Sequence, residues 1–147
     1  MSELSEHPGV AAAIKGLLVV VPGPRELQLD IDSQAATDQY TAMADIFRKN
    51  GECFTETSRT TSAGGNTHIY VTIPCGWPDL DSTTRVALQA CFGSDLTREA
   101  LSLLRILRRY DIPPICLFEC PPNRVPARLV KDDSGDTVKV DDPRADA

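Results

Sequence analysis

The chain has 147 residues, which is enough for one domain with a single hydrophobic core. Its hydrophobic content of 41% and charged content of 24% are ordinary for a globular protein, and no run approaches the roughly 18 apolar residues of a membrane span. The net charge of −6 and the aromatic content of 5% argue against a protein that binds nucleic acid mainly through a basic surface or by base stacking.

The N-terminus and the cysteines bear on where the protein resides. The first residues, MSELSEHPGV, include acidic residues and no Lys or Arg, so they lack the basic n-region of a signal peptide. The five cysteines show no CxxC spacing, which predicts reduced and mostly buried thiols rather than a disulfide set or a zinc site. Together these features predict a cytoplasmic protein.

Hydrophobic periodicity and turn residues predict an ordered domain over residues 17–120, after a loosely ordered lead-in at 1–16 with a short helix at 9–16. Strands are predicted at 16–22, 26–32, 52–60, 67–73 and 113–119. Helices are predicted at 34–49 after Ser33, at 82–92 after Asp81 or Ser82, and at 95–109 after Ser94. This order predicts an α+β fold, with helices on one face of a mostly antiparallel sheet.

The strands at 26–32 and 67–73 alternate between apolar and other residues, so each has two distinct faces. The apolar face consists of Leu27, Leu29, Ile31, Ile69, Val71 and Ile73. The second face consists of Gln28, Asp30, Asp32, His68, Tyr70 and Thr72. We expect the apolar face to pack against the helices and the second face to be the open side of the sheet.

The helix expected at 95–109 has an apolar side and a side that carries arginines. Its predicted core stripe consists of Leu96, Ala100, Leu103, Leu104 and Leu107. Arg98, Arg105 and Arg109 recur at helical spacing on another side, which makes them candidate contacts for the phosphates of nucleic acid. A solvated face opposite the leucines, partly neutralised by Glu99, explains the same arginines equally well.

The C-terminal segment is rich in proline and then in aspartate, which predicts a disordered tail over residues 121–147. From Lys131 to Ala147 there are six Asp against two Lys and one Arg, a net charge of −3, so residues 1–130 carry the other −3 of the total −6. Any nucleic-acid contact therefore needs a local basic patch. The acidic tail is a candidate surface for a protein partner.

The stretch ELQLDIDS, residues 26–33, contains a pair of aspartates that project from the same side of a strand. Like charges at that spacing repel, and a divalent cation relieves the repulsion. Asp30 and Asp32 are therefore candidate metal ligands. The alternative is a solvated strand end in which Asp32 and Ser33 cap the following helix.

The stretch TTSAGGNTHIYVTIP, residues 60–74, joins a glycine-bearing turn to a strand. Successive N–H groups around Gly64 and Gly65 can form a nest for an anion, to which Ser62 and His68 add side-chain donors. Arg59 lies beside the turn and is a further candidate phosphate contact. The alternative is a simple hairpin turn with an exposed histidine.

Together these stretches resemble the archaeo-eukaryotic primase and primase–polymerase superfamily, most closely the polymerase domain of bacterial end-joining DNA ligases. That family has a hydrophobic strand ending in DxD, a TSG…H strand turn, and a third acid at the end of a hydrophobic strand. Here these are Leu29-Asp30-Ile31-Asp32, the run TSAGGNTH at 61–68 leading into IYV, and ICLF leading into Glu119. The family's third acid is normally Asp, and here it is Glu.

The resemblance implies a reduced, RRM-like primase–polymerase core and a metal-dependent nucleotidyltransferase of DNA replication or repair. Asp30, Asp32 and Glu119 would bind Mg²⁺ or Mn²⁺, and Ser62 and His68 would contact the triphosphate of a nucleotide. The implied partners are a nucleoside triphosphate and a DNA or RNA primer-template. No membrane partner is expected.

Two other readings remain open. One is a non-catalytic descendant of that fold that binds nucleotide or nucleic acid, or serves as an accessory module. The other is a plain α+β interaction protein in which the match of the motifs is a coincidence. The lack of a second His-x-Thr/Ser strand argues against a two-histidine phosphoesterase.

Overall fold

The computed structural model describes His7 and residues 16–62, 65–110, 117–119, 128–131 and 137–140, with the backbone alone at 118–119, 128–131 and 137–140. Its elements, in chain order, are β1 (Leu18–Val20), β2 (Glu26–Ile31), α2 (Gln34–Lys49), β3 (Thr55–Thr61), β4 (Thr67–Thr72), α3 (Ser82–Cys91), α4 (Leu96–Leu107), β5 (Leu117–Glu119), β6 (Arg128–Lys131) and β7 (Thr137–Val140). The helix expected at 9–16 lies outside the described residues.

The helices begin where side chains cap them. The Ser33 hydroxyl accepts a hydrogen bond from the Ala36 N–H at 3.1 Å, so the predicted start of α2 is confirmed. Asp81 caps α3 through the Thr84 N–H at 2.7 Å. Helix α4 begins one residue later than predicted, because its N-cap is Asp95.

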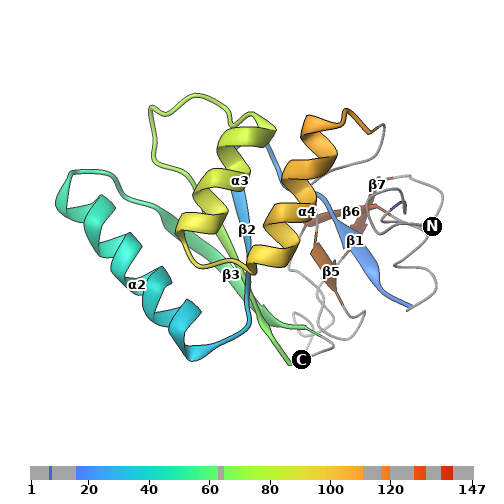
Figure 1. The fold of residues 1–147 in the computed structure, drawn as a ribbon, viewed down its shortest axis with the longest axis horizontal. Helices are drawn as coiled ribbons and strands as arrows, with labels where there is room; N and C mark the ends of the chain where they lie inside the picture. Colours follow the sequence, from blue (N-terminus) through green and yellow to red (C-terminus); the bar gives the residue numbers. More distant parts are fainter. Residues whose placement is uncertain are drawn as a thin grey trace.

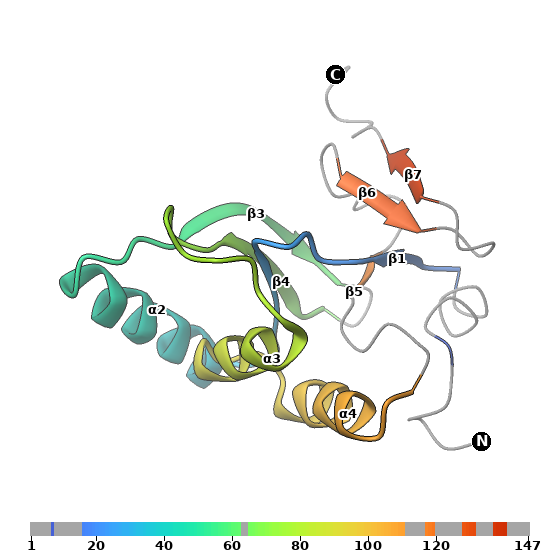
Figure 2. The same cartoon turned by 90° about the horizontal axis from the view of Figure 1, so that it is seen from above.

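The strands form two sheets, and the predicted α+β class is confirmed. Strands β2, β4 and β3 make an antiparallel sheet in that order, and the three labelled helices lie on one face of it (Figures 1 and 2). A second sheet has the order β5-β1-β6-β7. The prediction of one sheet was therefore incomplete. Strands β6 and β7 also lie where only a disordered tail was predicted.

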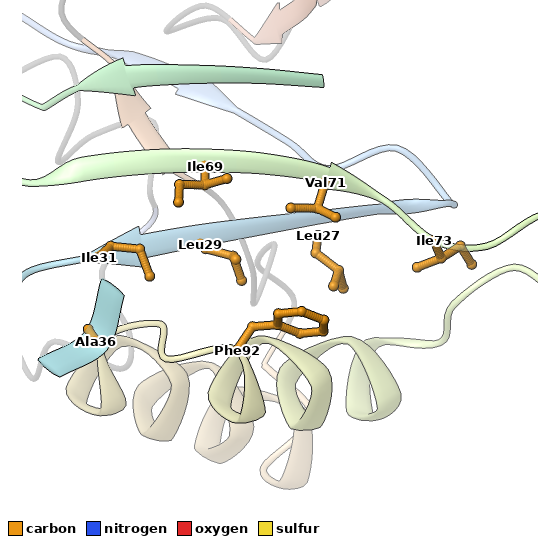
Figure 3. Close-up of a cluster of buried hydrophobic side chains, with 8 residues drawn as sticks. All are labelled: Leu27, Leu29, Ile31, Ala36, Ile69, Val71, Ile73 and Phe92. Carbon is orange, nitrogen blue, oxygen red and sulfur yellow. The ribbon is translucent and has the colours of Figure 1, made fainter. Parts of the chain in front are cut away.

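The main core lies between the three-stranded sheet and the helices, as predicted. The apolar side chains of β2 and β4 face Phe92, which follows α3, and Ala36 of α2 (Figure 3). Around them pack partly buried aromatic residues, namely Tyr40, Phe47, Phe54 and Trp77. Strand alternation is what sends one residue in two to this side.

The opposite face of the sheet is not open, which corrects the prediction. Gln28 and Tyr70 are fully buried and His68 is only 4% exposed. Tyr70 forms a second buried cluster with Val20 of β1 and Leu117 of β5, so the second sheet covers this part of the face. The covering sheet forms by pairing of strands that are far apart in the sequence, such as β1 and β5. The alternation of apolar and polar residues within β2 or β4 does not indicate whether another sheet packs on the second face.

Helix α4 is turned the other way from its predicted orientation. Leu96 is 71% exposed, Leu107 is 68% exposed and Leu104 is 38% exposed, whereas Glu99 and Ser102 are each only 2% exposed. The predicted core stripe is therefore wrong at Leu96, Ala100, Leu104 and Leu107, whereas Leu103 is half-buried. The physical reason is that polar side chains on this side of α4, including Arg98 and Glu99, hydrogen-bond to groups at the edge of β2 and to the residues that bind that edge.

Gly93, in the turn between α3 and α4, allows that turn to approach the start of α2. Its φ is +89°, and a Cβ there would lie 2.7 Å from the Ala36 carbonyl oxygen. We expect Gly93→Ala to lower the free energy of unfolding by about 2–4 kcal/mol, from left-handed strain plus overpacking. Gly76→Ala is the control, because Gly76 has φ +93° with nothing within 4 Å. Equal losses in urea denaturation would contradict the role of the Ala36 contact.

Two further expectations can be compared with the described residues. Cys53, Cys75 and Cys91 are free, and all three are exposed, so their predicted burial was wrong. Among the helices of the described ranges, none has both the length and the apolar character that crossing a membrane requires. The acidic tail lies largely outside the described residues, so its interaction with a protein stays a prediction.

Candidate functional site

The register of β2 and β4 brings the two sequence motifs together. Asp30 is paired directly with His68, and directly paired residues point to the same side of a sheet. His68 Nε2 lies 3.7 Å from Asp30 Oδ1. The Asp30 side chain is 18% exposed and that of His68 is 5% exposed, so the pair lies at the rim of the covered face. The expectation that these motifs share one face agrees with this geometry.

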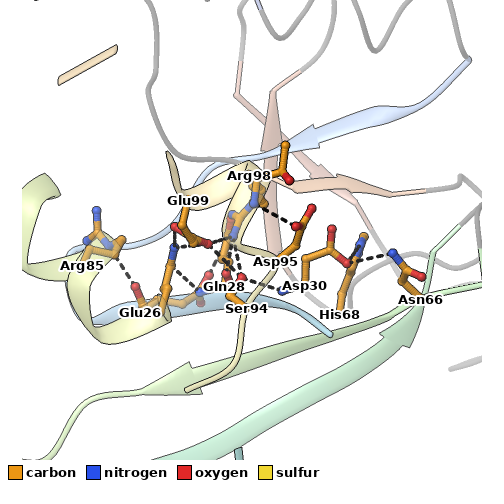
Figure 4. A network of polar contacts seen from close by, with 12 residues as sticks. Glu26, Gln28, Asp30, Asn66, His68, Arg85, Ser94, Asp95, Arg98 and Glu99 are labelled. Carbon is orange, nitrogen blue, oxygen red and sulfur yellow. Dashed lines mark hydrogen bonds and ion pairs between the residues drawn. The ribbon is translucent and has the colours of Figure 1, made fainter. Parts of the chain in front are cut away.

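Asn66 completes the described part of this cluster. Its Nδ2 donates a hydrogen bond to Asp30 Oδ1 at 3.4 Å (Figure 4). Sequence reasoning did not single out Asn66 as a site residue. The signal was present, because Asn66 lies two positions before His68 and strand alternation places both on one side.

The hairpin turn uses its own donors. The N–H groups of Ser62, Gly65 and Asn66 donate to Asn66 O, Ser62 O and Ser62 Oγ at 2.8, 3.0 and 3.0 Å. Gly65 has φ +87°, as the turn requires. The predicted anion nest therefore lacks these donors in this conformation, and Gly64 lies outside the described residues. The Ser62 hydroxyl accepts from Asn66, which leaves it a hydrogen to donate.

Arg59 lies on the other side of the sheet from His68. It pairs with Ile69, and its neighbour Thr60 pairs with His68. Arg59 Nε and Nη2 donate to the Glu56 carboxylate at 2.8 and 3.0 Å. The Tyr40 hydroxyl also donates to Glu56, and mainly burial, with this neighbour, raises the pKa of Tyr40 to about 12. The alternation of β3 thus places Arg59 on the opposite side of the sheet from His68, and its predicted contact with phosphate stays a prediction.

The two other predicted acids are Asp32 and Glu119. Asp32 follows the end of β2 and is exposed. Glu119 ends β5 and is paired with Leu18 in the second sheet, and its side chain lies outside the described part of the structure. Within the described side chains, no group of three or more His, Cys, Asp and Glu residues could hold a metal ion. The structure therefore brings Asp30 to His68 and leaves the third acid undecided.

Arg98 binds the sheet and does not join a surface stripe. Strand β2 is at the edge of its sheet, so backbone groups on its outer side need other partners. Arg98 Nη1 donates to the Gln28 carbonyl oxygen at 2.8 Å, and the Arg98 side chain is only 14% exposed (Figure 4). The predicted row of Arg98, Arg105 and Arg109 is thus broken, with only Arg109 fully on the surface.

A buried polar network satisfies the rest of this edge. The Gln28 N–H donates to Gln89 Oε1 at 2.9 Å, and the Asp30 N–H donates to Ser94 Oγ at 3.0 Å. Gln89 and Ser94 in turn donate to the Glu99 carboxylate, at 3.0 and 2.8 Å for the shorter contacts (Figure 4). Glu99 must face inward to accept these bonds, and this turns Leu96, Leu104 and Leu107 outward.

The same network positions the backbone that carries Asp30. The Asp95 N–H donates to the Asp30 carbonyl oxygen at 2.8 Å, so both backbone groups of Asp30 are held from the turn before α4. Sequence reasoning treated Ser94 only as a helix cap and missed its role here. The sequence gives little indication of this role, because a serine before a helix is equally typical of a helix cap and of a side chain that binds the backbone of an edge strand.

No significant match to a protein-family model, to a curated protein or to a solved structure was found for this chain. The resemblance of its motifs to the primase–polymerase superfamily is therefore carried by the motifs alone.

Proposed function

We propose that this chain binds a nucleoside triphosphate together with Mg²⁺ or Mn²⁺ at the cluster formed by Asp30, His68 and the hairpin turn. The observation that carries the proposal is the direct pairing of Asp30 with His68, at 3.7 Å between Oδ1 and Nε2. An acidic group and a nitrogen base at one rim suit a ligand that combines a cation with phosphate. The resemblance to primase–polymerases assigns the same roles to these positions.

The carboxylates present fit a cation that is shared with a substrate. Asp30 retains some exposure, and among the described residues its carboxylate accepts one long hydrogen bond, from Asn66 at 3.4 Å. Asp32 is exposed two residues further on. Mg²⁺ typically takes one or two carboxylates and completes its shell with phosphate oxygens and water. Asp30 and Asp32 would hold the ion, which would neutralise the negative charge of the phosphates.

The histidine and the turn serine would bind the phosphate side of the ligand. An imidazole N–H of His68 and the Ser62 hydroxyl are both able to donate to phosphate oxygens. The fixed pairing of β4 with both neighbours holds His68 in place, because it is registered with Asp30 on one side and Thr60 on the other. Binding thus depends on positions that the sheet itself determines.

Nucleotidyl transfer would require more than this cluster. A third carboxylate would have to complete the metal site, and Glu119 is the position that the resemblance suggests. We therefore propose nucleotide binding as the main function and nucleotidyl transfer as a second, dependent one. The competing functions are a non-catalytic accessory module and a plain interaction protein. A nucleic-acid partner and a cytoplasmic location belong to this proposal.

The proposal is tested by titrating a labelled nucleoside triphosphate, with and without Mn²⁺, against the wild type and Asp30→Ala. We expect metal-dependent binding that weakens at least about tenfold in the variant, which corresponds to about 1.4 kcal/mol. The control is Asp38→Ala, because Asp38 is an exposed acid on α2. Thermal melting checks that both variants remain folded.

Two outcomes decide the matter. A wild type that binds no triphosphate, with or without metal, would end the proposal and favour the plain interaction protein. If binding is found, primer extension by the same samples distinguishes transfer from binding alone. Incorporation that is lost in Glu119→Ala, while binding persists, would identify the third carboxylate.

A further inference from the structure

The outer side of α4 carries an apolar stripe that is exposed among the described residues. Its members lie on consecutive turns and are all exposed: Leu96, Ala100, Leu104 and Leu107. On a helix, residues three and four apart are neighbours, so these side chains form one continuous surface. Large apolar residues grouped in this way mark an interaction surface rather than scattered exposure.

The stripe is a fixed feature of the fold. Glu99 and Ser102, on the inward side of α4, are each 2% exposed, and Glu99 accepts bonds from Gln89 and Ser94. Turning the leucines inward would break these bonds and leave a carboxylate facing solvent while its donors stay buried. The helix therefore cannot hide the stripe by rotating, and no residue in the described part of the chain buries it.

The charges at the ends of α4 indicate the orientation of that partner. Arg108 and Arg109 lie at the C-terminal end and are exposed, whereas Asp95 lies at the N-terminal end. If two copies packed their α4 helices in parallel, the arginines of both copies would meet. An antiparallel pair instead places the arginines of each copy near Asp95 of the other, and it also opposes the two helix dipoles.

The stripe is complementary to itself in the antiparallel orientation. Along the helix, the point halfway between Leu96 and Leu107 lies within one residue of the point halfway between Ala100 and Leu104. One two-fold axis can therefore relate both pairs. A two-fold axis at that point sets Leu96 of one copy against Leu107 of the other, and Ala100 against Leu104. The small Ala100 opposite a leucine allows close approach. Isologous contacts of this kind are the commonest way in which identical chains associate.

We propose that the protein forms a two-fold symmetric homodimer through antiparallel packing of the α4 stripe. The partner is a second copy of this chain, because both the order of the apolar residues and the placement of the end charges match under the same two-fold operation. This interface is independent of the nucleotide cluster, so either proposal can fail without the other.

Sedimentation equilibrium of the full chain tests the dimer. We expect a monomer–dimer equilibrium in the wild type, and a dissociation constant raised at least tenfold in Leu96→Glu/Leu107→Glu. Ile46→Glu is the matched control, because Ile46 is 52% exposed on α2, outside the stripe. A wild type that stays monomeric at all concentrations would overturn the proposal, and so would a dimer that the double variant leaves intact.

The orientation is tested by reversing one charge. Arg108→Glu is expected to weaken an antiparallel dimer several-fold, because the new glutamate approaches Asp95 of the second copy. In a parallel dimer the same change would relieve repulsion and strengthen association, which would overturn the antiparallel arrangement. Lys49→Glu, at the C-terminal end of α2, makes the same change in charge away from the stripe and is expected to leave the equilibrium unchanged.

Discussion

Replacing Phe92 with alanine is expected to lower the free energy of unfolding by about 3–5 kcal/mol, the range for removing a large buried aromatic side chain. Phe92 is fully buried and lies at the centre of the main core. Its ring stacks on Phe47 with centroids 5.5 Å apart and contacts Phe54 at 4.9 Å and Tyr40 at 5.9 Å. The loss therefore affects α2, α3 and the segment entering β3 at once.

Urea denaturation followed by fluorescence or circular dichroism measures this effect. Ile46→Ala is the comparison, because Ile46 is 52% exposed and its truncation is expected to change stability by less than about 0.5 kcal/mol. A loss below about 1 kcal/mol for Phe92→Ala would mean that the ring is not packed between the helices and the sheet as described.

The sequence predicts well those features that depend on near neighbours. Helix α2 has the predicted bounds, because its cap Ser33 and its apolar periodicity all lie within its own segment. The β3–β4 hairpin and the alternation of β2 are local in the same sense. The pairing of Asp30 with His68 could also be predicted from the sequence. When two strands are antiparallel and their apolar faces must coincide, only a few pairing registers are possible.

The prediction fails where a distant partner decides. Leucine periodicity shows that α4 is amphipathic, but it does not show which side is buried. The bond that joins α4 to the edge of β2 runs from Arg98 to the Gln28 carbonyl oxygen, 70 positions away in the sequence. Glu99 also accepts bonds from Gln89 and Ser94, which themselves bind backbone N–H groups of β2. The backbone groups on the outer side of an edge strand need hydrogen-bond partners. On β2, the inward side of α4 supplies one of them through Arg98. The cover over Tyr70 has the same non-local origin.

Glu99 is the residue on which the orientation of α4 depends, and Glu99→Ala is expected to lower the free energy of unfolding by about 3–5 kcal/mol. The carboxylate is 2% exposed and forms an ion pair with Arg98. Without it the Arg98 guanidinium loses the carboxylate that lies 2.5 Å away, and the Gln89 amide and Ser94 hydroxyl lose their acceptor. Groups of this kind left buried without a partner account for the large cost.

A double-mutant cycle with Arg98→Ala distinguishes the ion pair from simple loss of packing. If the two charges are coupled, the double variant loses less stability than the sum of the two single variants, because each single variant leaves one member of the pair behind and the double variant removes both. The leucine stripe gives a second readout. Once Glu99 is gone, α4 is free to rotate, so a dimer built on the outward leucines should weaken as well. Strictly additive losses with an unchanged dimer would show that α4 is oriented by something other than Glu99.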